Sequence, residues 1–458
     1  MNYLDKMCLR LIVGLSIMFL TGCEKFLAEK TSKKLVLPER IEDLQALLDN
    51  VNYTNYTGPS AASVSADDYY LTGQKFDALA EEYNRRMYTW ERDYLFSTTG
   101  FNNWTDIYKS VYCANTALQG LESIPKNPQN RTAWDNVKGQ ALFCRGNSFL
   151  DAAGIWCLAY EATTAKSDPG LPLRFNTDFN EVSRRSDLQQ TYDQIIADLK
   201  GAASLLPLAA LSKHRSNKAA AYGLLSRTFL FMRNYDQAGL YADSCLALQS
   251  ELLDYNSLAP TASFPFKIEG NPEILYVRYI KSIAVLSGTN PVTPTELYDL
   301  FAEGDLRKRL FFADNTDGTH YFKGGYLGSD GPNAGISTDE VLLIKAECLA
   351  RTDDAMGGLS LVNRLMLKRW DKSKAYLPFT TSDSAEALRI ILVERRKELM
   401  MRGLRWMDIK RLNKEGYNIS LKRLINGKIY SLEANDLRFA LPIPEDVIAL
   451  SGMEQNRR

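Results

Sequence analysis

Residues 218–248 read KAAAYGLLSRTFLFMRNYDQAGLYADSCLAL, and this stretch decides the fold class of the chain. Its apolar and small residues recur at helical intervals, at Leu225, Phe229, Ala238, Ala242 and Cys245. Residues three and four apart share one face of a helix, so the pattern indicates two helices that bury facing sides. Small side chains on the second helix let the two helices approach closely. The stretch therefore predicts a closely packed helix pair.

This spacing matches the tetratricopeptide repeat, a helix–turn–helix unit of about 34 residues. A second match lies within 339–370, at Ala346, Ala350, Leu359, Asn363 and Met366. Apolar residues at the same intervals predict further helices over 102–121, 136–160 and 187–206. We therefore expect a mainly α fold, with a tetratricopeptide-like helix-pair scaffold over about 102–250 and 338–415.

Two segments outside this scaffold lack helical periodicity, and we expect them to be loop-rich insertions with short strands. The first, about 50–101, is polar and aromatic and is predicted to be mostly loop. The second, about 251–337, is rich in Pro and Gly and contains strand-like runs such as Glu273 to Tyr279. Within it, Asp317-Gly318 between aromatic runs predicts a hairpin turn.

The amino-terminal residues have the features of a targeting segment. Two basic residues precede the apolar run Leu11–Leu20, which is too short to cross a bilayer because a spanning helix needs about 20 residues. The run ends in Leu-Thr-Gly-Cys, which resembles the lipobox of bacterial lipoproteins and implies lipidation at Cys23. The expected organisation is a signal peptide over 1–22, a lipidated linker over 23–38 and a folded domain over 39–458.

Composition and charge exclude several classes of function. Lys plus Arg (55) equals Asp plus Glu (55), so no positive field favours nucleic acid as a partner. The five cysteines after Cys23 have no Cys-x-x-Cys spacing, which predicts no metal site and no redox pair. The two histidines stand alone, and nucleophile and phosphate-loop motifs are absent from the sequence. We expect a protein that is not an enzyme and that has no catalytic residues, metal or cofactor.

One charged block could still suggest catalysis. Glu394 and Glu398 share a helix face, and retaining glycosidases use two carboxylates. Both are flanked by arginine and lysine residues, which favour ionised and paired carboxylates over a raised-pKa acid. We therefore expect a structural ion-pair network. A glycosidase would require a carboxylate pair in a cleft.

Several blocks, read in order, resemble the SusD/RagB family over nearly the whole chain after the targeting segment. The most specific is ERRKEL at 394–399 followed by RGLRWMDIKR at 402–411, where Arg402 replaces an acid of the family pattern. ALFCRGNSFLDAAGIW at 141–156 is similar to the family's Ala-x-x-x-Arg helix, and LPIP at 441–444 is similar to a family ending. The resemblance rests on this ordered set.

The resemblance implies a lipoprotein anchored in the outer membrane and facing outside. Such a protein captures oligosaccharides and delivers them to a SusC-like TonB-dependent transporter. Two alternatives stay open. The first is a peptide-binding uptake lipoprotein of the RagB type. The second is a tetratricopeptide scaffold of the envelope that binds no ligand.

Loop aromatics are the candidates for the ligand site, because sugars stack their C–H faces on rings and need polar groups nearby. In the family, the aromatic platform comes from the loop before the first repeat helix and from the inserted region. The predicted ligand-binding residues are Tyr69, Tyr70, Trp90, Phe96, Phe101, Asn102, Tyr321 and Tyr326.

Overall fold

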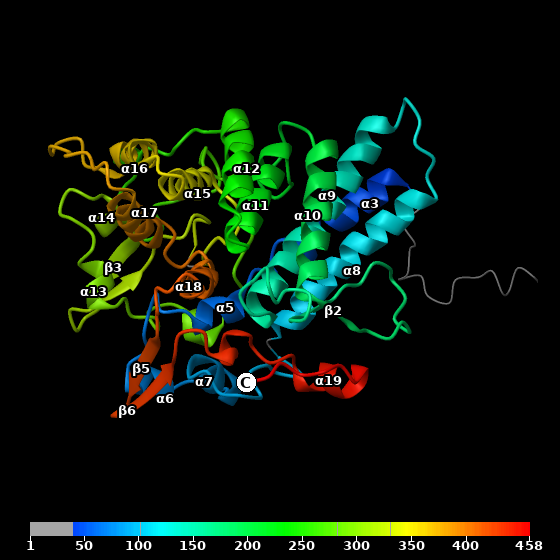
Figure 1. The fold of residues 1–458 in the computed structure, drawn as a ribbon, viewed down its shortest axis with the longest axis horizontal. Helices are drawn as coiled ribbons and strands as arrows, with labels where there is room; N and C mark the ends of the chain where they lie inside the picture. Colours follow the sequence, from blue (N-terminus) through cyan, green and yellow to red (C-terminus); the bar gives the residue numbers. More distant parts are fainter. Residues whose placement is uncertain (1–39, 101, 282, 330) are drawn as a thin grey trace, which may run out of the picture. The chain divides into compact units, whose positions relative to one another are not determined.

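The computed structural model describes residues 40–100, 102–281, 283–329 and 331–458. The predicted signal peptide, the linker with Cys23, and Phe101 therefore lie outside the described residues. The described part of the chain is mainly helical, as predicted, and its strands form three two-stranded sheets (Figure 1).

The scaffold is a row of helices, and each of its first seven members packs against the next one in the row (Figure 1). Its members are α8 (Asn103–Glu122), α9 (Arg131–Trp156), α10 (Leu188–Leu205), α11 (Lys218–Phe231), α12 (Tyr235–Leu248), α15 (Thr338–Arg351), α16 (Ala355–Arg369), α17 (Ser384–Glu398) and α18 (Arg405–Asn413). The two predicted repeats form the pairs α11–α12 and α15–α16. The predicted helix-pair scaffold is thereby confirmed.

Asn and Asp side chains fix where several of these helices begin. Asp187 starts α10 with a capping box, because its carboxylate accepts the Gln190 N–H while the Gln190 side chain accepts the Asp187 N–H. Asn217 and Asn234 cap α11 and α12 by accepting a first-turn N–H each. A cap of this kind stabilises a helix by about 1 kcal/mol.

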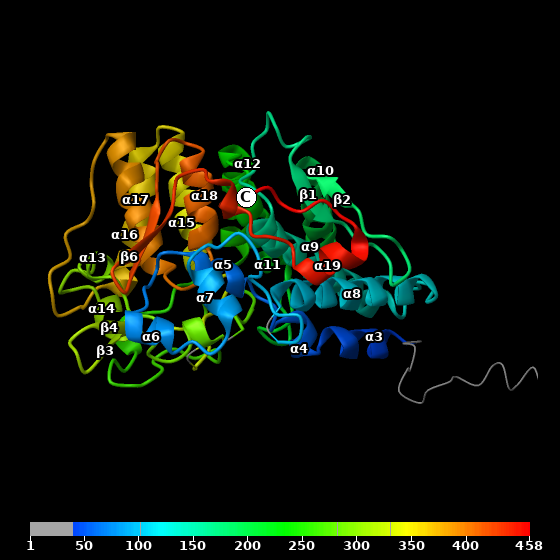
Figure 2. The same cartoon turned by 90° about the horizontal axis from the view of Figure 1, so that it is seen from below.

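The segment before the scaffold differs from the predicted loop. Residues 50–100 form the short helices α4 (Val51–Thr54), α5 (Ser60–Ser65), α6 (Gly73–Asp77) and α7 (Glu82–Tyr88), and α3 (Ile41–Leu48) precedes this predicted loop. Helices α4 to α7 span four to seven residues, too few for a hydrophobic period to appear in the sequence. All of α5 is buried, against α7, α9 and α18, while α3 packs on α8 and α9 (Figure 2). This insertion is therefore partly core.

The second insertion consists of short elements. They are η1 (Tyr255–Ser257), η2 (Ala284–Leu286), α13 (Thr295–Tyr298), α14 (Arg307–Phe311), β3 (Phe312–Asp314) and β4 (His320–Phe322). Strands β3 and β4 pair antiparallel, and Gly318 between them has a φ of 80°. The predicted hairpin turn at Asp317-Gly318 is confirmed.

The strand predicted over Glu273–Tyr279 is wrong. Ile274 and Tyr279 form single bridges only, to Ser337 and Asn333. Between these bridges the N–H groups of Leu275 and Tyr276 both donate to the Ile336 carbonyl, so the register is irregular and no regular ladder forms.

The remaining elements lie between α9 and α10 or follow α18. They are β1 (Pro169–Pro172), β2 (Arg185–Asp187), β5 (Leu421–Ile425), β6 (Lys428–Leu432), η3 (Leu437–Phe439) and α19 (Glu445–Ser451). The loop from β1 to β2 and the helix α19 line a groove together with α8.

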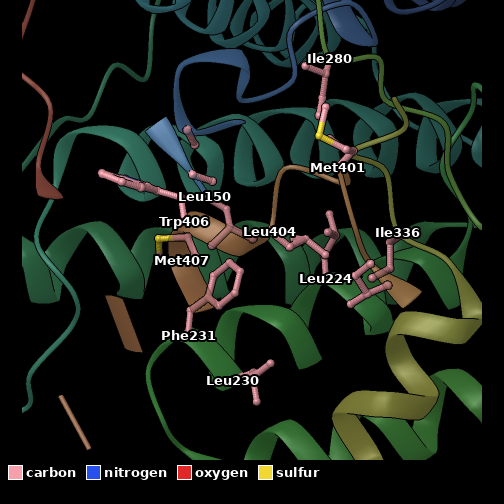
Figure 3. Close-up of a cluster of buried hydrophobic side chains, with 14 of the residues drawn as sticks. Leu150, Leu224, Leu230, Phe231, Ile280, Ile336, Met401, Leu404, Trp406 and Met407 are labelled. Carbon is pink, nitrogen blue, oxygen red and sulfur yellow. The ribbon is translucent and has the colours of Figure 1, made fainter. Parts of the chain in front are cut away.

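Apolar side chains from α9, α11 and α18 meet in one buried cluster (Figure 3). Its members include Leu150, Leu224, Leu230, Phe231, Ile280, Ile336, Met401, Leu404, Trp406 and Met407. Trp406 is fully buried and packs on Phe439, with ring centroids 4.7 Å apart. The block that carries the family resemblance therefore also supplies core.

A buried ion-pair network joins α14, α16 and α17. Arg307 pairs with Asp305 and Glu394, both at 2.6 Å, and with Glu398 at 2.9 Å. Glu398 also pairs with Arg369 at 2.7 Å. The predicted structural network around Glu394 and Glu398 is confirmed, and its partners come from distant parts of the sequence.

Lys410 is a buried cation whose hydrogen bonds go to main-chain carbonyls. Its ammonium donates to the oxygens of Gly154 at 2.9 Å and Cys157 at 2.6 Å, at the carboxyl end of α9. A cation is favourable there because the last carbonyls of a helix carry partial negative charge. Burial nevertheless lowers the pKa of Lys410 to about 7.

We expect Lys410 to make stability depend on pH. Between the folded pKa of about 7 and the ordinary value of 10.5, the unfolded chain binds the proton and the folded chain does not. Stability therefore rises with pH in this window. From about pH 6 to about pH 9, the free energy of unfolding of the wild type should rise by on the order of 2 kcal/mol more than that of Lys410→Met.

Urea unfolding at both pH values measures this difference. The exposed Lys414, just after α18, supplies the control variant Lys414→Met, which should follow the wild type. Parallel pH profiles for the wild type and Lys410→Met would contradict the prediction.

Candidate ligand-binding site

Four of the predicted ligand-binding aromatics lie in the hydrophobic core. Tyr69, Trp90, Phe96 and Tyr326 are between 1% and 6% exposed. The Tyr69 hydroxyl donates to the Val64 carbonyl at 2.8 Å. Prediction of these four as ligand contacts is wrong in this structure, because their rings present no open face.

Hydrogen bonds explain how the Trp90 and Tyr326 rings, two of these four, stay buried. The Trp90 indole N–H donates to the Ser65 carbonyl at 3.0 Å. The Tyr326 hydroxyl donates to Glu273 at 2.8 Å and lies 2.8 Å from the Tyr255 hydroxyl. Buried tyrosine and tryptophan satisfy their polar atoms in this way, so they serve the core as well as a ligand site.

Asn102 is the N-cap of α8. Its side-chain oxygen accepts the N–H of Trp104 at 3.0 Å and of Thr105 at 3.4 Å, and its amide donates to the Ser97 carbonyl at 3.3 Å. With both ends of the amide engaged and the residue 7% exposed, Asn102 holds the loop and is not free to bind a ligand. The expectation that it contacts ligand is corrected accordingly.

Tyr70 and Tyr321 are partly exposed, and the structure brings both to the β3–β4 hairpin. Tyr70 pairs with Val292 through two main-chain hydrogen bonds, and Thr293 donates its N–H to the His320 carbonyl at 2.8 Å. Tyr321 lies on β4 opposite Ala313. The two insertions therefore meet here. We call Tyr70, Tyr321 and His320 the hairpin cluster.

Polar groups surround the hairpin cluster. His320 lies 2.9 Å from the exposed carboxylate of Asp314. Burial raises the pKa of Tyr70, and the nearby charges of Asp317 and Glu296 raise it further. Aromatic rings beside carboxylates can stack on a sugar and accept its hydroxyl protons.

Tyr298 also lies at the hairpin cluster, although it was not predicted from the sequence as a ligand-binding residue. Its ring stacks on His320 with centroids 3.7 Å apart, and the Lys308 ammonium lies 4.8 Å from its centroid. No local sequence signal links Tyr298 to His320, because the contact forms only when α13 meets the hairpin.

Asp67 and Asp68 tie the first insertion to the scaffold. Asp67 pairs with Arg405 at 2.6 Å and with Arg396 at 3.0 Å. Although burial alone would raise the pKa of Asp67, these two guanidinium groups hold it well below its usual range. Burial raises the pKa of Asp68 to about 6, and its carboxylate accepts the Met401 N–H at 3.0 Å. These contacts hold the first insertion against α17 and α18.

Two family models match the chain. Residues 25–230 match a model described as "Starch-binding associating with outer membrane", and residues 338–457 match the SusD family model. Both matches include scaffold helices, and the second covers the block at 394–411.

The chain belongs to the SusD/RagB family.

This SusD/RagB chain is similar to one relative in sequence and to two solved structures in fold. SusD-like protein P38 of Formosa agariphila is 23% identical over 389 residues, which are 69% of this chain and 73% of that protein. A SusD superfamily structure from Bacteroides thetaiotaomicron has a TM-score of 0.72 at 21% identity and covers 91% of this chain and 100% of its own. A SusD-like carbohydrate binding protein from Bacteroides vulgatus has a TM-score of 0.65 at 18% identity, covering 90% and 97%.

The SusD/RagB block at 394–411 serves the structure of this chain. Glu394 and Glu398 are 3% and 2% exposed, and both pair with Arg307. Arg402, the departure from the family pattern, donates to the Asn333 carbonyl at 2.6 Å and pairs with Asp339 at 3.4 Å. The carboxylates at 394 and 398 are thus closed off from any substrate.

Proposed function

We propose that this SusD/RagB protein is a lipid-anchored binding protein that captures oligosaccharides outside the cell and passes them to a SusC-like TonB-dependent transporter. The description of the matched family model and the name of the Bacteroides vulgatus relative support a carbohydrate ligand. The observation in this chain that carries the proposal is the hairpin cluster, where partly exposed rings lie beside carboxylates.

The hairpin cluster suits weak, reversible capture. Tyr70 and Tyr321 offer rings for stacking, while Asp314 and Asp317 offer acceptors for hydroxyl groups. The residues before α8 are the second part of the proposed platform, and of these Phe101 lies outside the described residues. Exposed contacts of this size bind weakly, so closure against a transporter would retain the ligand.

Anchoring is proposed through the lipid on Cys23. Within the described residues, no helix is long and apolar enough to cross a membrane. One acyl chain holds a protein marginally and two or more hold it stably, at about 0.8 kcal/mol per buried CH₂. A lipid anchor at the start of the linker would leave the whole folded domain free to meet a transporter.

We propose that the protein acts without catalysis. Its paired carboxylates at Glu394 and Glu398 are buried in ion pairs, which removes the glycosidase alternative at that position. Among the described residues, no group of three or more His, Cys, Asp or Glu side chains is placed to hold a metal ion.

Tyr321→Ala should weaken binding to whichever polysaccharide the protein captures, by roughly 2- to 10-fold, because one stacked ring contributes about 0.5–1.5 kcal/mol. Affinity electrophoresis in native gels that contain soluble starch, xylan, laminarin or mannan measures the change as a loss of retardation. Tyr417→Ala changes a 44% exposed ring away from the hairpin and is the matched control. If Tyr70→Ala and Tyr321→Ala both migrate as the wild type does in a gel that retards it, the hairpin cluster is not the site.

A further inference from the structure

A groove separate from the hairpin cluster runs beside the carboxyl terminus. A pocket of about 460 Å³ lies between α8, the loop after β1 and α19. A second pocket of about 440 Å³ adjoins it, because both are lined by Val182, Ser183, Ser451 and Met453. We call the two together the C-terminal groove. Residues of α8 and α19 line the first pocket together, and Figure 2 shows the two helices next to each other.

The first pocket carries an exposed aromatic pair. Phe179 is 82% exposed and stacks on Tyr112 with centroids 5.0 Å apart and planes 26° from parallel. Tyr112 is itself 38% exposed. Leu450 on α19, 90% exposed, lines the same pocket. Leaving this much apolar surface in water is unfavourable, and grouped exposed apolar side chains mark binding sites.

Hydrogen bonds hold the loop that presents Phe179. The Asn115 amide on α8 donates to the carbonyls of Arg174 at 3.0 Å and Asn176 at 3.3 Å. The Gln119 side-chain oxygen accepts from the Thr177 hydroxyl at 2.8 Å. A loop fixed in this way presents its ring without a further ordering cost on binding.

The loop also fixes its own charged groups. Arg174 donates to the Glu181 carbonyl at 2.6 Å and to the Ser183 hydroxyl at 3.2 Å. The Asn176 amide donates to the Glu181 carboxylate at 2.6 Å. With the Phe179 ring, these contacts bring carboxylate and amide groups to one wall of the pocket.

This chemistry selects a ligand class. Carboxylates of Asp178 and Glu181 accept hydroxyl protons, and the Phe179 face accepts the C–H side of a sugar ring. Arg174, Arg184 and Arg185 line the same groove, so it offers both donors and acceptors without a field of a single sign, which suits a neutral ligand. Two helices and a loop form the walls of the first pocket, which favours stacking over pairing with an extended peptide. Each pocket falls within the range of roughly 300–1,000 Å³ found for small-molecule sites.

We infer that the C-terminal groove is a second oligosaccharide site, lined by Phe179 and Tyr112, that takes a neutral chain spanning both pockets. This inference rests on the proposed function, since it extends carbohydrate capture to a further surface. Because the pockets adjoin, hexasaccharides bind more tightly than the disaccharides of the same sugar. Val182 sits where the pockets join and is 66% exposed.

The test is calorimetric titration of the full chain in detergent with maltohexaose, cellohexaose, xylohexaose and laminarihexaose. Phe179→Ala removes the exposed ring, and Val182→Trp blocks the junction of the two pockets. Each should raise the dissociation constant for the bound hexasaccharide roughly fivefold or more. Phe264→Ala changes another exposed phenylalanine, in a different loop, and should leave the constant unchanged. Hydrogen exchange should slow on binding over 172–183 and 447–453.

Unchanged affinity in both Phe179→Ala and Val182→Trp would overturn the inference. If those variants bind normally while Tyr321→Ala does not, the second site is refuted and the proposed function stands. If the wild type binds none of the four sugars but binds a peptide mixture, both proposals fail together.

Discussion

Replacing Arg307 with methionine should lower the free energy of unfolding by about 3–5 kcal/mol. Arg307 is fully buried and bonds three carboxylates, those of Asp305, Glu394 and Glu398. Lys397 also contacts Asp305 and Glu394, so it offsets only part of the charge that the substitution leaves behind. Methionine fills similar volume, so the loss measures uncompensated buried charge.

Arg309 provides the control within the same short helix. It pairs with Asp371 and is 53% exposed, so Arg309→Met should cost about 0–1 kcal/mol. Urea unfolding followed by circular dichroism measures both variants. Equal stability losses for the buried and the exposed arginine would show that the buried network does not hold α14 to α17.

Replacing Cys23 with alanine should move the protein from the membrane fraction to the soluble fraction. The Leu-Thr-Gly-Cys sequence places the thiol at the position that bacterial lipoproteins acylate, and without acyl chains the proposed anchor is gone. Fractionation after labelling with a palmitate analogue measures both the location and the lipid.

Cys8→Ala is the matched control, because Cys8 lies inside the predicted signal peptide and away from the lipobox. It should remain labelled and membrane-bound. Label on Cys23→Ala, or its retention in the outer membrane, would refute the anchoring proposal.

The scaffold could be predicted because its helices are long enough for their apolar faces to repeat. Helix α11 buries Leu225 and Phe229, two of the residues that set the pattern. Helix α5 could not be predicted, since six residues of SAASVS carry no period and are buried on all sides. Charge patterning around Glu394 predicted an ion-pair network, yet Arg307 and Arg369 could not be named as its partners because folding brings them from elsewhere.

The ligand site was harder to predict for a physical reason. A tyrosine or tryptophan ring suits both a wet surface and a core, provided its polar atom finds a partner, as the Trp90 N–H finds Ser65. Aromatic composition therefore did not separate Tyr69, which is core, from Tyr70, which is partly exposed. Pairs such as Phe179 with Tyr112 form between distant segments, so only the structure reveals them.

The central claim is that this SusD/RagB protein captures oligosaccharides, and calorimetry of the purified chain against matched sugars and peptides tests it most directly. Oligosaccharides released from host and plant polysaccharides form one arm, and mixed peptides form the other. We expect saturable heat with at least one oligosaccharide and none with the peptides. Saturable heat with peptides alone, or no saturable heat with either oligosaccharides or peptides, would contradict the claim.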